Sequence, residues 1–183
     1  MRFTILAAEW NAKLVALAKV MNSKVALPIY STFLLELKDG VLRITASDMD
    51  CSRCSTLPVM DMDRANEHNG SLCVTASFLL DSLKNLGDQP VTFEADEENL
   101  SVVIRYNNGQ FDMVGFPAKD YALPGTMGKS VQVTIEASVL NDSIGKSLYA
   151  VGNDDLRPIF SGIYFTKKGD ELQCATTNGS MLV

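Results

Sequence analysis

Hydrophobic and polar positions along this chain alternate, then repeat at helical spacing, and then alternate again. Residues 2–6 alternate as a half-buried strand does, and residues 8–20 carry apolar side chains along one helix face. Leu27-Pro28 ends this helical segment, because the residue before a proline is kept out of the helical region. Three further alternating segments predict strands, at residues 30–38, 41–47 and 52–59. The pattern predicts a unit of one strand, one helix and three strands, written βαβββ.

The same order of elements begins again at residue 71. Residues 71–75 alternate as a strand does, and residues 76–86 carry Phe78, Leu79 and Leu83 at helical spacing. Three more alternating segments follow, at residues 91–95, 100–106 and 110–116. We therefore expect a second complete βαβββ unit directly after the first.

A third copy starts at residue 131 and matches the first at a constant spacing of 130 residues. Pro158-Ile159 falls on Pro28-Ile29, and Thr134-Ile135 falls on Thr4-Ile5. The elements predicted for this copy are a strand, a helix and a hairpin, at residues 131–136, 138–151 and 160–177. A period of this length indicates duplicated domains rather than short stacked repeats.

The repeat and the turn-forming residues divide the chain into parts. We expect residues 1–121 to form a first domain of two βαβββ units, residues 122–130 to be a linker containing Pro124 and Gly125, and residues 131–183 to be the first half of a second domain. Two units let two antiparallel sheets and two helices share one core, so the predicted fold class is α+β. A lone unit leaves a helix stripe and strand edges uncovered, so we expect the second domain to be truncated.

Composition excludes several classes of protein. Hydrophobic residues make up 46% and charged residues 21% of the chain, as in ordinary soluble proteins. No apolar run approaches the roughly 18 residues that a membrane span requires, and Glu9 interrupts any secretory signal, so we expect a cytoplasmic protein. The net charge of −6 argues against a nucleic-acid footprint over the whole surface and leaves room for a local basic face.

Five segments of the chain, in their order and spacing, resemble one known family. They are MRFTI, LPIYSTFLLELKDGVLRITASDMD, GQFDMVGFPAKDY, NDDLRPIFSGIYF and CATTNGSMLV. The resemblance is to the bacterial sliding clamp, the beta subunit of DNA polymerase III. It implies a DNA clamp fold in which two three-domain subunits close into a ring around duplex DNA, with helices on the inner face and sheets outside. It also implies a non-catalytic processivity factor that tethers the replicative polymerase.

The resemblance implies three surfaces on this chain. The basic residues on or near helices that would attract DNA are Lys13, Lys19, Lys24, Lys84, Lys146 and Arg157. The contact between the subunits of a homodimer would use Phe78, Asn108, Gln110, Phe111 and Met113. A crevice for short linear peptides of the polymerase and the clamp loader would be walled in part by Phe160, Thr177, Gly179, Ser180, Met181 and Leu182. Because Ser180 and Met181 stand where the family commonly has basic or aromatic-polar residues, we expect apolar anchoring of the peptide.

A metal-dependent hydrolase is the alternative function, and its ligands would be the aspartates Asp48, Asp50, Asp61 and Asp63. Cys51 and Cys54 form a lone pair without the second pair that structural zinc requires, so we expect buried or half-buried thiols. Residues 125–130 end like a phosphate-binding loop, but Leu123 replaces the first glycine of the motif and a strand is predicted to follow. We expect no metal, cofactor or catalytic residue.

Overall fold

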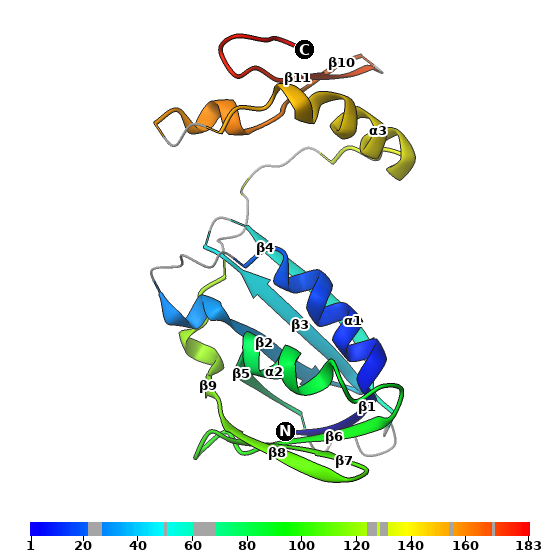
Figure 1. Ribbon diagram of the computed structural model, residues 1–183, viewed down its shortest axis with the longest axis vertical. Helices are drawn as coiled ribbons and strands as arrows, with labels where there is room; N and C mark the ends of the chain where they lie inside the picture. The colour runs from blue at the N-terminus through cyan, green and yellow to red at the C-terminus, as the bar shows by residue number, and fades with distance from the viewer. Residues whose placement is uncertain are drawn as a thin grey trace. The chain divides into compact units, whose positions relative to one another are not determined.

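Figure 1 shows the computed structural model, which describes residues 1–21, 27–49, 51–60, 69–123, 128, 132–153, 156–169 and 171–183. Contacts divide the chain into two compact units, Met1–Thr126 and Met127–Val183, called unit 1 and unit 2 below. Each is described by itself.

Unit 1 contains two successive βαβββ halves, which confirms the order of elements predicted from the sequence. The first half consists of β1 (Arg2–Leu6), α1 (Ala7–Ala18), β2 (Thr32–Lys38), β3 (Val41–Ser47) and β4 (Ser52–Pro58). The second half consists of β5 (Gly70–Thr75), α2 (Ala76–Leu83), β6 (Pro90–Ala95), β7 (Ser101–Tyr106) and β8 (Gly109–Val114). A short 3-10 turn, η1 (Pro28–Ser31), precedes β2, so this strand begins two residues later than the alternation predicts.

The two halves exchange their first strands. The strand order is β1-β6-β7-β8 in one antiparallel sheet and β4-β3-β2-β5-β9 in the other, where β9 is Phe116–Pro117. β1 from the first half therefore pairs with β6 from the second, with Phe3 opposite Phe93. β5 from the second half pairs with β2 from the first, with Val74 opposite Phe33. Neither half can complete its own sheet without a strand from the other.

An aromatic cluster lies where the halves meet in the core. Phe3 and Phe93 stack with ring centroids 4.9 Å apart, and Trp10 of α1 meets both rings edge-on, at 5.5 and 5.8 Å. All three side chains are at most 1% exposed. Edge-to-face and offset pairs of this kind add about 0.5–1.5 kcal/mol each beyond the area they bury. α1 contacts α2, and Figure 1 shows both helices on the same side of the five-stranded sheet.

A second, smaller core packs Tyr121 against the five-stranded sheet. It consists of Tyr30, Leu34, Cys73 and Tyr121. The Tyr30 and Tyr121 rings meet edge-on with centroids 5.5 Å apart, and the Tyr30 hydroxyl donates a hydrogen bond to the Ala122 carbonyl at 3.0 Å. Burial raises the pKa of the Cys73 thiol to about 12 and the pKa of the Tyr121 phenol to about 12.

Unit 2 repeats the local structure of the first half of unit 1 at the spacing of 130 residues. It contains α3 (Ala137–Ser147), η5 (Pro158–Ser161), β10 (Tyr164–Lys168) and β11 (Glu171–Ala175), with a 3-10 turn at Leu148–Ala150. β10 and β11 pair in the register of β2 and β3: Tyr164 lies opposite Ala175, as Leu34 lies opposite Thr45. An isolated bridge from Thr177 to Leu182 likewise repeats the pair Ser47–Ser52.

The strand predicted at residues 131–136 is not formed over its described part, residues 132–136. Its counterpart in unit 1 is β1, which is held by β6 of the other half. Unit 2 contains one βαβββ unit only in part, so residues 132–136 have no equivalent of β6 to pair with among the described residues. The prediction of a strand is therefore wrong for the described residues. Alternation alone is not enough, because a strand also needs a partner for its backbone groups.

The shifted pKa values predict how the stability of unit 1 depends on pH. Cys73 and Tyr121 hold their protons more tightly in the folded chain than in the unfolded chain. Their contribution to the free energy of unfolding is therefore complete below the unfolded pKa values of 9.0 and 10.0, and it is lost as the pH rises toward about 12. We expect the melting temperature of unit 1 to fall across this window. The decline should be shallower in Cys73→Ala, and an equal decline in both proteins would contradict the assignment to Cys73.

Candidate DNA-facing helices, edge strand and peptide pocket

The exposed face of α1 carries two of the predicted basic residues. Lys13 lies in the helix and Lys19 is its C-cap, and both are exposed. Glu9 lies in the first turn of the helix, so the face carries both signs of charge. A carboxylate near the N-terminus and an ammonium at the C-terminus each interact favourably with the helix dipole, and each stabilises the helix by roughly 0.3–1 kcal/mol. Lys24 lies outside the described residues.

The basic residues predicted on the other helices are paired with acidic neighbours. Lys84 at the end of α2 lies 2.8 Å from an Asp81 carboxylate oxygen, and Lys146 of α3 lies 2.7 Å from Asp142. All four side chains are well exposed, so each ion pair contributes little to stability. The pairs do, however, offset the local positive charge that a phosphate would meet.

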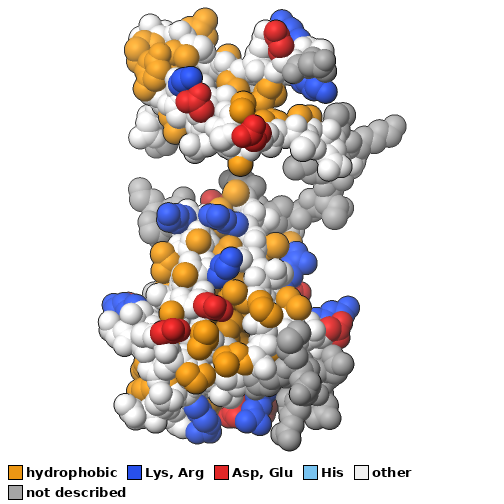
Figure 2. Space-filling model, turned by 90° about the vertical axis from the view of Figure 1, so that its right-hand side faces the viewer, with side chains coloured by type: hydrophobic (Ala, Val, Ile, Leu, Met, Phe, Trp, Pro, Cys, Tyr) orange, Lys and Arg blue, Asp and Glu red, His pale blue; other side chains and the backbone are white. Residues whose placement is uncertain are grey.

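Arg53 is a cation that the sequence did not single out. It lies on β4, and its guanidinium Nη1 donates a hydrogen bond to the Ala16 carbonyl of α1 at 3.1 Å. Figure 2 views unit 1 from the right-hand side of Figure 1 and shows Lys and Arg side chains at both ends of this face, with apolar and acidic side chains between them. Strand alternation identifies Arg53 as exposed, but only the packing of β4 against α1 brings it to the helix.

The edge strand β8 separates the predicted interface residues into two groups. Phe111 and Met113 pack against the main core, and the Phe111 ring stacks on Tyr106 with centroids 5.0 Å apart. Gln110 is exposed and its side chain bonds with Arg105 and Asp112, while Asn108 is exposed in the adjoining turn. Phe78 of α2 is 40% exposed. Val114, which is 71% exposed at the end of this edge strand, was missed because alternation alone does not show which sheet edge is open.

A pocket in unit 2 brings together much of the predicted peptide crevice. Phe160, Thr177 and Leu182 line a cavity of about 260 Å³. Five other residues complete the lining: Ile159, Gly162, Tyr164, Ala175 and Thr176. Of these, Ile159 is 84% and Tyr164 is 66% exposed, so the pocket offers apolar surface to a ligand.

Arg157, predicted near the third helix, contacts a residue that lines this pocket. Its guanidinium carbon lies 4.8 Å from the centre of the Phe160 ring, a cation–π geometry. The Phe160 ring also lines the pocket. That Arg157 attracts DNA stays a prediction.

A tight corner formed by residues 177–181 adjoins the pocket. Thr177 lines the cavity, whereas Gly179, Ser180 and Met181 of the predicted crevice are not among its lining residues. The Thr177 hydroxyl donates to the Met181 carbonyl at 2.5 Å and accepts from the Gly179 amide at 3.0 Å. The Asn178 side chain accepts from the Met181 amide at 2.9 Å. This pattern holds Ser180 and Met181 on the exposed tip of the corner.

The corresponding corner in unit 1 has the same hydrogen bonds. Ser47 donates to the Cys51 carbonyl at 2.9 Å, and Asp48 accepts from the Cys51 amide at 2.8 Å. The central residue is left-handed in both corners, with φ of 86° at Met49 and 91° at Gly179. A β-carbon on Gly179 would stand 3.8 Å from Phe160, so the conformation rather than crowding favours glycine.

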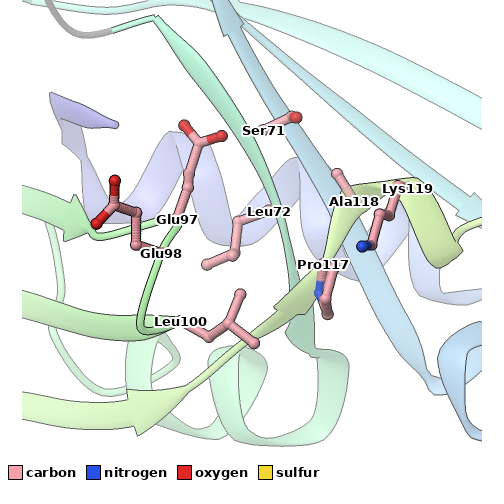
Figure 3. A pocket seen from close by; sticks show the side chains of 8 residues that line it. All are labelled: Ser71, Leu72, Glu97, Glu98, Leu100, Pro117, Ala118 and Lys119. Carbon is pink, nitrogen blue, oxygen red and sulfur yellow. The ribbon is translucent and has the colours of Figure 1, made fainter.

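A separate hollow of about 410 Å³ lies on unit 1 (Figure 3). It lies between the turn after β6 and the segment formed by β9 and the 3-10 turn η3 (Ala118–Asp120). Leu72, Leu100 and Pro117 supply its apolar lining, with Glu97 and Glu98 on one side and Lys119 on the other. It contains none of the residues predicted to be functional.

The structure gives no support to the aspartate cluster of the hydrolase alternative. Asp48 accepts a backbone hydrogen bond within its corner, and Asp50, Asp61 and Asp63 lie outside the described residues. Among the residues that are described, no group of three His, Cys, Asp or Glu side chains could hold a metal ion. Lys129 and Ser130 of the loop-like motif are likewise not described.

Cys51 and Cys54 are exposed, which corrects the prediction of buried or half-buried thiols. β4 is the edge strand of its sheet and most of its residues are exposed, so Cys54 has no layer to cover it. In the described part of the chain, no helix is long and apolar enough to cross a membrane.

Residues 1–124 match the family "DNA polymerase III beta subunit, N-terminal domain". The whole chain is 25% identical to the beta sliding clamp of Bacillus subtilis and 24% identical to that of Staphylococcus aureus, over 49% of each relative's length. A crystal structure of the DNA polymerase III beta subunit from Pseudomonas aeruginosa superposes with a TM-score of 0.90 at 23% identity, over 100% of this chain and 48% of that one.

A second Pseudomonas aeruginosa structure, of a sliding clamp bound to griselimycin, has a TM-score of 0.88 at 23% identity, over 98% of this chain and 47% of that one. These likenesses show that the chain has the DNA clamp fold. The match over residues 1–124 shows further that the chain belongs to the DNA polymerase III beta subunit family. It spans about half the length of the relatives that it matches.

The left-handed corner generates a paired prediction. Gly179→Ala should destabilise unit 2 by about 1 kcal/mol, because an alanine resists a φ of 91°. Gly145→Ala is the matched control: it lies inside α3 with no described atom within 4 Å of an added β-carbon, so it should be stabilising by roughly 0.5–1 kcal/mol. Hydrogen exchange of the α3 amides measures both changes. Equal effects of the two substitutions would show that the corner does not require glycine.

Proposed function

We propose that this chain forms part of a sliding clamp, a ring that encircles duplex DNA and tethers the replicative polymerase. The observation that carries the proposal is the match of unit 1 to the beta subunit family, together with the paired βαβββ halves whose helices lie side by side. The family relatives are named beta sliding clamps. In this proposal residues 1–121 are the first clamp domain and residues 131–183 are half of the second.

The charges of the helix faces suit a ring that must slide. Because a ring that encloses duplex DNA cannot fall off sideways, the protein needs only weak, sequence-independent attraction to the phosphates. Lys13, Lys19 and Arg53 supply cations around α1, while the ion pairs of Lys84 and Lys146 reduce the attraction elsewhere. The net charge of −6 limits adhesion of DNA to the outer surface.

The pocket around Phe160 is proposed to hold a short linear peptide from a polymerase or a clamp loader. Ile159, Tyr164 and Leu182 offer apolar contacts, and the adjoining corner carries Ser180 and Met181 rather than cations. Anchoring by apolar side chains therefore dominates, and charge pairing with the peptide contributes less. The griselimycin-bound clamp from Pseudomonas aeruginosa shows that a relative of the same fold binds a ligand.

The open edge of β8 is proposed to contact a second subunit. The edge leaves strand backbone groups unpaired in the sheet, and Val114 and Phe78 add exposed apolar surface. Asn108 and Gln110 would lie at the polar rim of the contact, whereas Phe111 and Met113 support the strand from the core side. The protein has no catalytic step in this role, and it acts in the cytoplasm as part of a polymerase assembly.

Retention on circular DNA tests the proposal. A full-length version of the protein, incubated with a bacterial clamp loader and ATP on nicked circular duplex, should elute with the DNA on gel filtration. Cutting the circle with a restriction enzyme should release it, because a ring runs off a free end. Equal retention on circular and linear DNA would identify ordinary DNA binding instead.

The α1 cations generate a quantitative prediction. Replacing both Lys13 and Lys19 by alanine should weaken binding to duplex DNA and lower the slope of log affinity against log salt by up to about 0.9 per lost phosphate contact. Lys119→Ala removes an exposed lysine on η3 and serves as the matched control. Fluorescence anisotropy with labelled duplex across a salt series measures the slopes. A slope that changes only in the control would exclude α1 as the DNA-facing helix.

A further inference from the structure

A network of side chains crosses the four-stranded sheet of unit 1 and ends at its open edge. Arg2 of β1 lies 3.2 Å from one oxygen of the Glu94 carboxylate on β6, and Arg105 of β7 lies 3.3 Å from the other oxygen. Arg105 also donates a hydrogen bond to the Gln110 side-chain oxygen on β8 at 2.6 Å, and the Gln110 amide nitrogen donates to Asp112 at 3.0 Å. Along each strand these residues alternate with residues that form or pack against the main core cluster. The network therefore lies on the face of the sheet that is turned away from the core.

The network fixes which way the Gln110 amide points. An amide has an acceptor at its oxygen and donors at its nitrogen. The Gln110 oxygen faces the Arg105 guanidinium, and the Gln110 nitrogen lies 3.0 Å from each of the two Asp112 carboxylate oxygens. The reverse orientation would place donor against donor and acceptor against acceptor. Gln110 is therefore engaged at both ends within its own chain, and it transmits the position of Arg105 to Asp112.

Asp112 ends the network with a negative charge at the sheet edge. Asp112 is exposed, and it forms no ion pair with any residue that the structure describes. β8 is the last strand in the order β1-β6-β7-β8, so the edge beyond it has no strand beside it in the described part of the chain. Val114 lies two residues further along the same face and is 71% exposed. This edge therefore presents a carboxylate and an apolar side chain next to each other.

We propose that Asp112 is the group by which the open edge of β8 recognises its partner, and that the partner is a subunit that places a lysine or arginine side chain against it. This inference rests on the proposed function, in which β8 contacts a second subunit. A carboxylate that enters a contact loses water, and the loss is unfavourable unless a cation replaces the water. A lysine or arginine also has a long apolar stem, which can cover Val114 while its charged end reaches Asp112. A partner with an acidic side chain at this place would be rejected by repulsion.

Arg105 positions Asp112 for this contact through Gln110. The planar guanidinium holds its N–H groups in a fixed arrangement, so it bonds to Glu94 and to Gln110 at once. Arg2 reaches the same Glu94 carboxylate, but it lies on β1, which two strands separate from β8. Exposed ion pairs of this kind add little to folding stability. The contribution of Arg105 therefore lies in the arrangement of the edge, and it is a positioning residue.

Dissociation of the dimer in a full-length version of the protein tests the role of Asp112. Asp112→Asn keeps an acceptor for Gln110 and removes the charge, so it should raise the dissociation constant roughly fivefold at low salt and flatten its salt dependence. Glu36→Gln is the matched control, because it removes the charge of a carboxylate that lies on β2 of the other sheet and is 42% exposed. The control should change neither quantity. Sedimentation velocity over a series of concentrations, at low and at high salt, measures both.

A pair of arginine variants tests the positioning role of Arg105. Arg2 and Arg105 are 53% and 54% exposed and bind the same carboxylate, so either substitution by alanine removes one ion pair from Glu94. Both variants should therefore have similar melting temperatures. Arg105→Ala should nevertheless raise the dimer dissociation constant about threefold, and Arg2→Ala should leave it unchanged. Equal dissociation constants would show that Arg105 does not act on the edge.

A third variant separates this inference from the proposed function. Val114→Lys places a charge against the apolar part of the edge, so it should raise the dissociation constant more than tenfold wherever β8 is the contact, by the roughly 2 kcal/mol expected at a buried position. If Val114→Lys dissociates the dimer and Asp112→Asn changes neither the dissociation constant nor its salt dependence, the contact at β8 stands and the role of Asp112 is wrong. A full-length protein that is monomeric at every concentration, or a dimer that Val114→Lys leaves intact, would overturn the contact and this inference together.

Discussion

The structure depends on the reciprocal exchange of first strands between two equivalent halves. β1 supplies an edge to the sheet of the second half, β5 joins the sheet of the first, and the Phe3–Trp10–Phe93 cluster fills the space where they meet. Because each half completes the other, backbone pairing and core burial are satisfied together. Unit 1 is therefore stable as a pair of halves, and neither half has a closed core alone.

Unit 2 shows what remains when the exchange does not take place within the described chain. The helix, the hairpin and the hydrogen-bonded corner still form, since their contacts are local. Residues 132–136 do not become a strand, and the helix keeps its apolar side chains partly exposed. The comparison separates structure that a short segment forms by itself from structure that needs a distant partner.

The surfaces relevant to function are consequences of the same architecture. Exchange of strands places α1 and α2 side by side, and the exposed side of α1 carries Lys13 together with the acidic Glu9. The charge on this face is therefore weak and of both signs. The pocket around Phe160 adjoins the corner that turns the chain after β11, where Thr177 and Asn178 accept hydrogen bonds from the Gly179 and Met181 amides.

The sequence by itself determined the βαβββ order, the repeat at 130 residues, the hairpin and corner positions, and the exposure of Lys13 and Lys19. Only the tertiary structure decided that β1 pairs with β6, that Phe111 and Met113 face the core, that Arg53 reaches α1, and that Cys54 is exposed. The reason is physical. Side-chain periodicity and turn chemistry act within a few residues, whereas strand pairing and the covering of a face depend on residues far away in the chain.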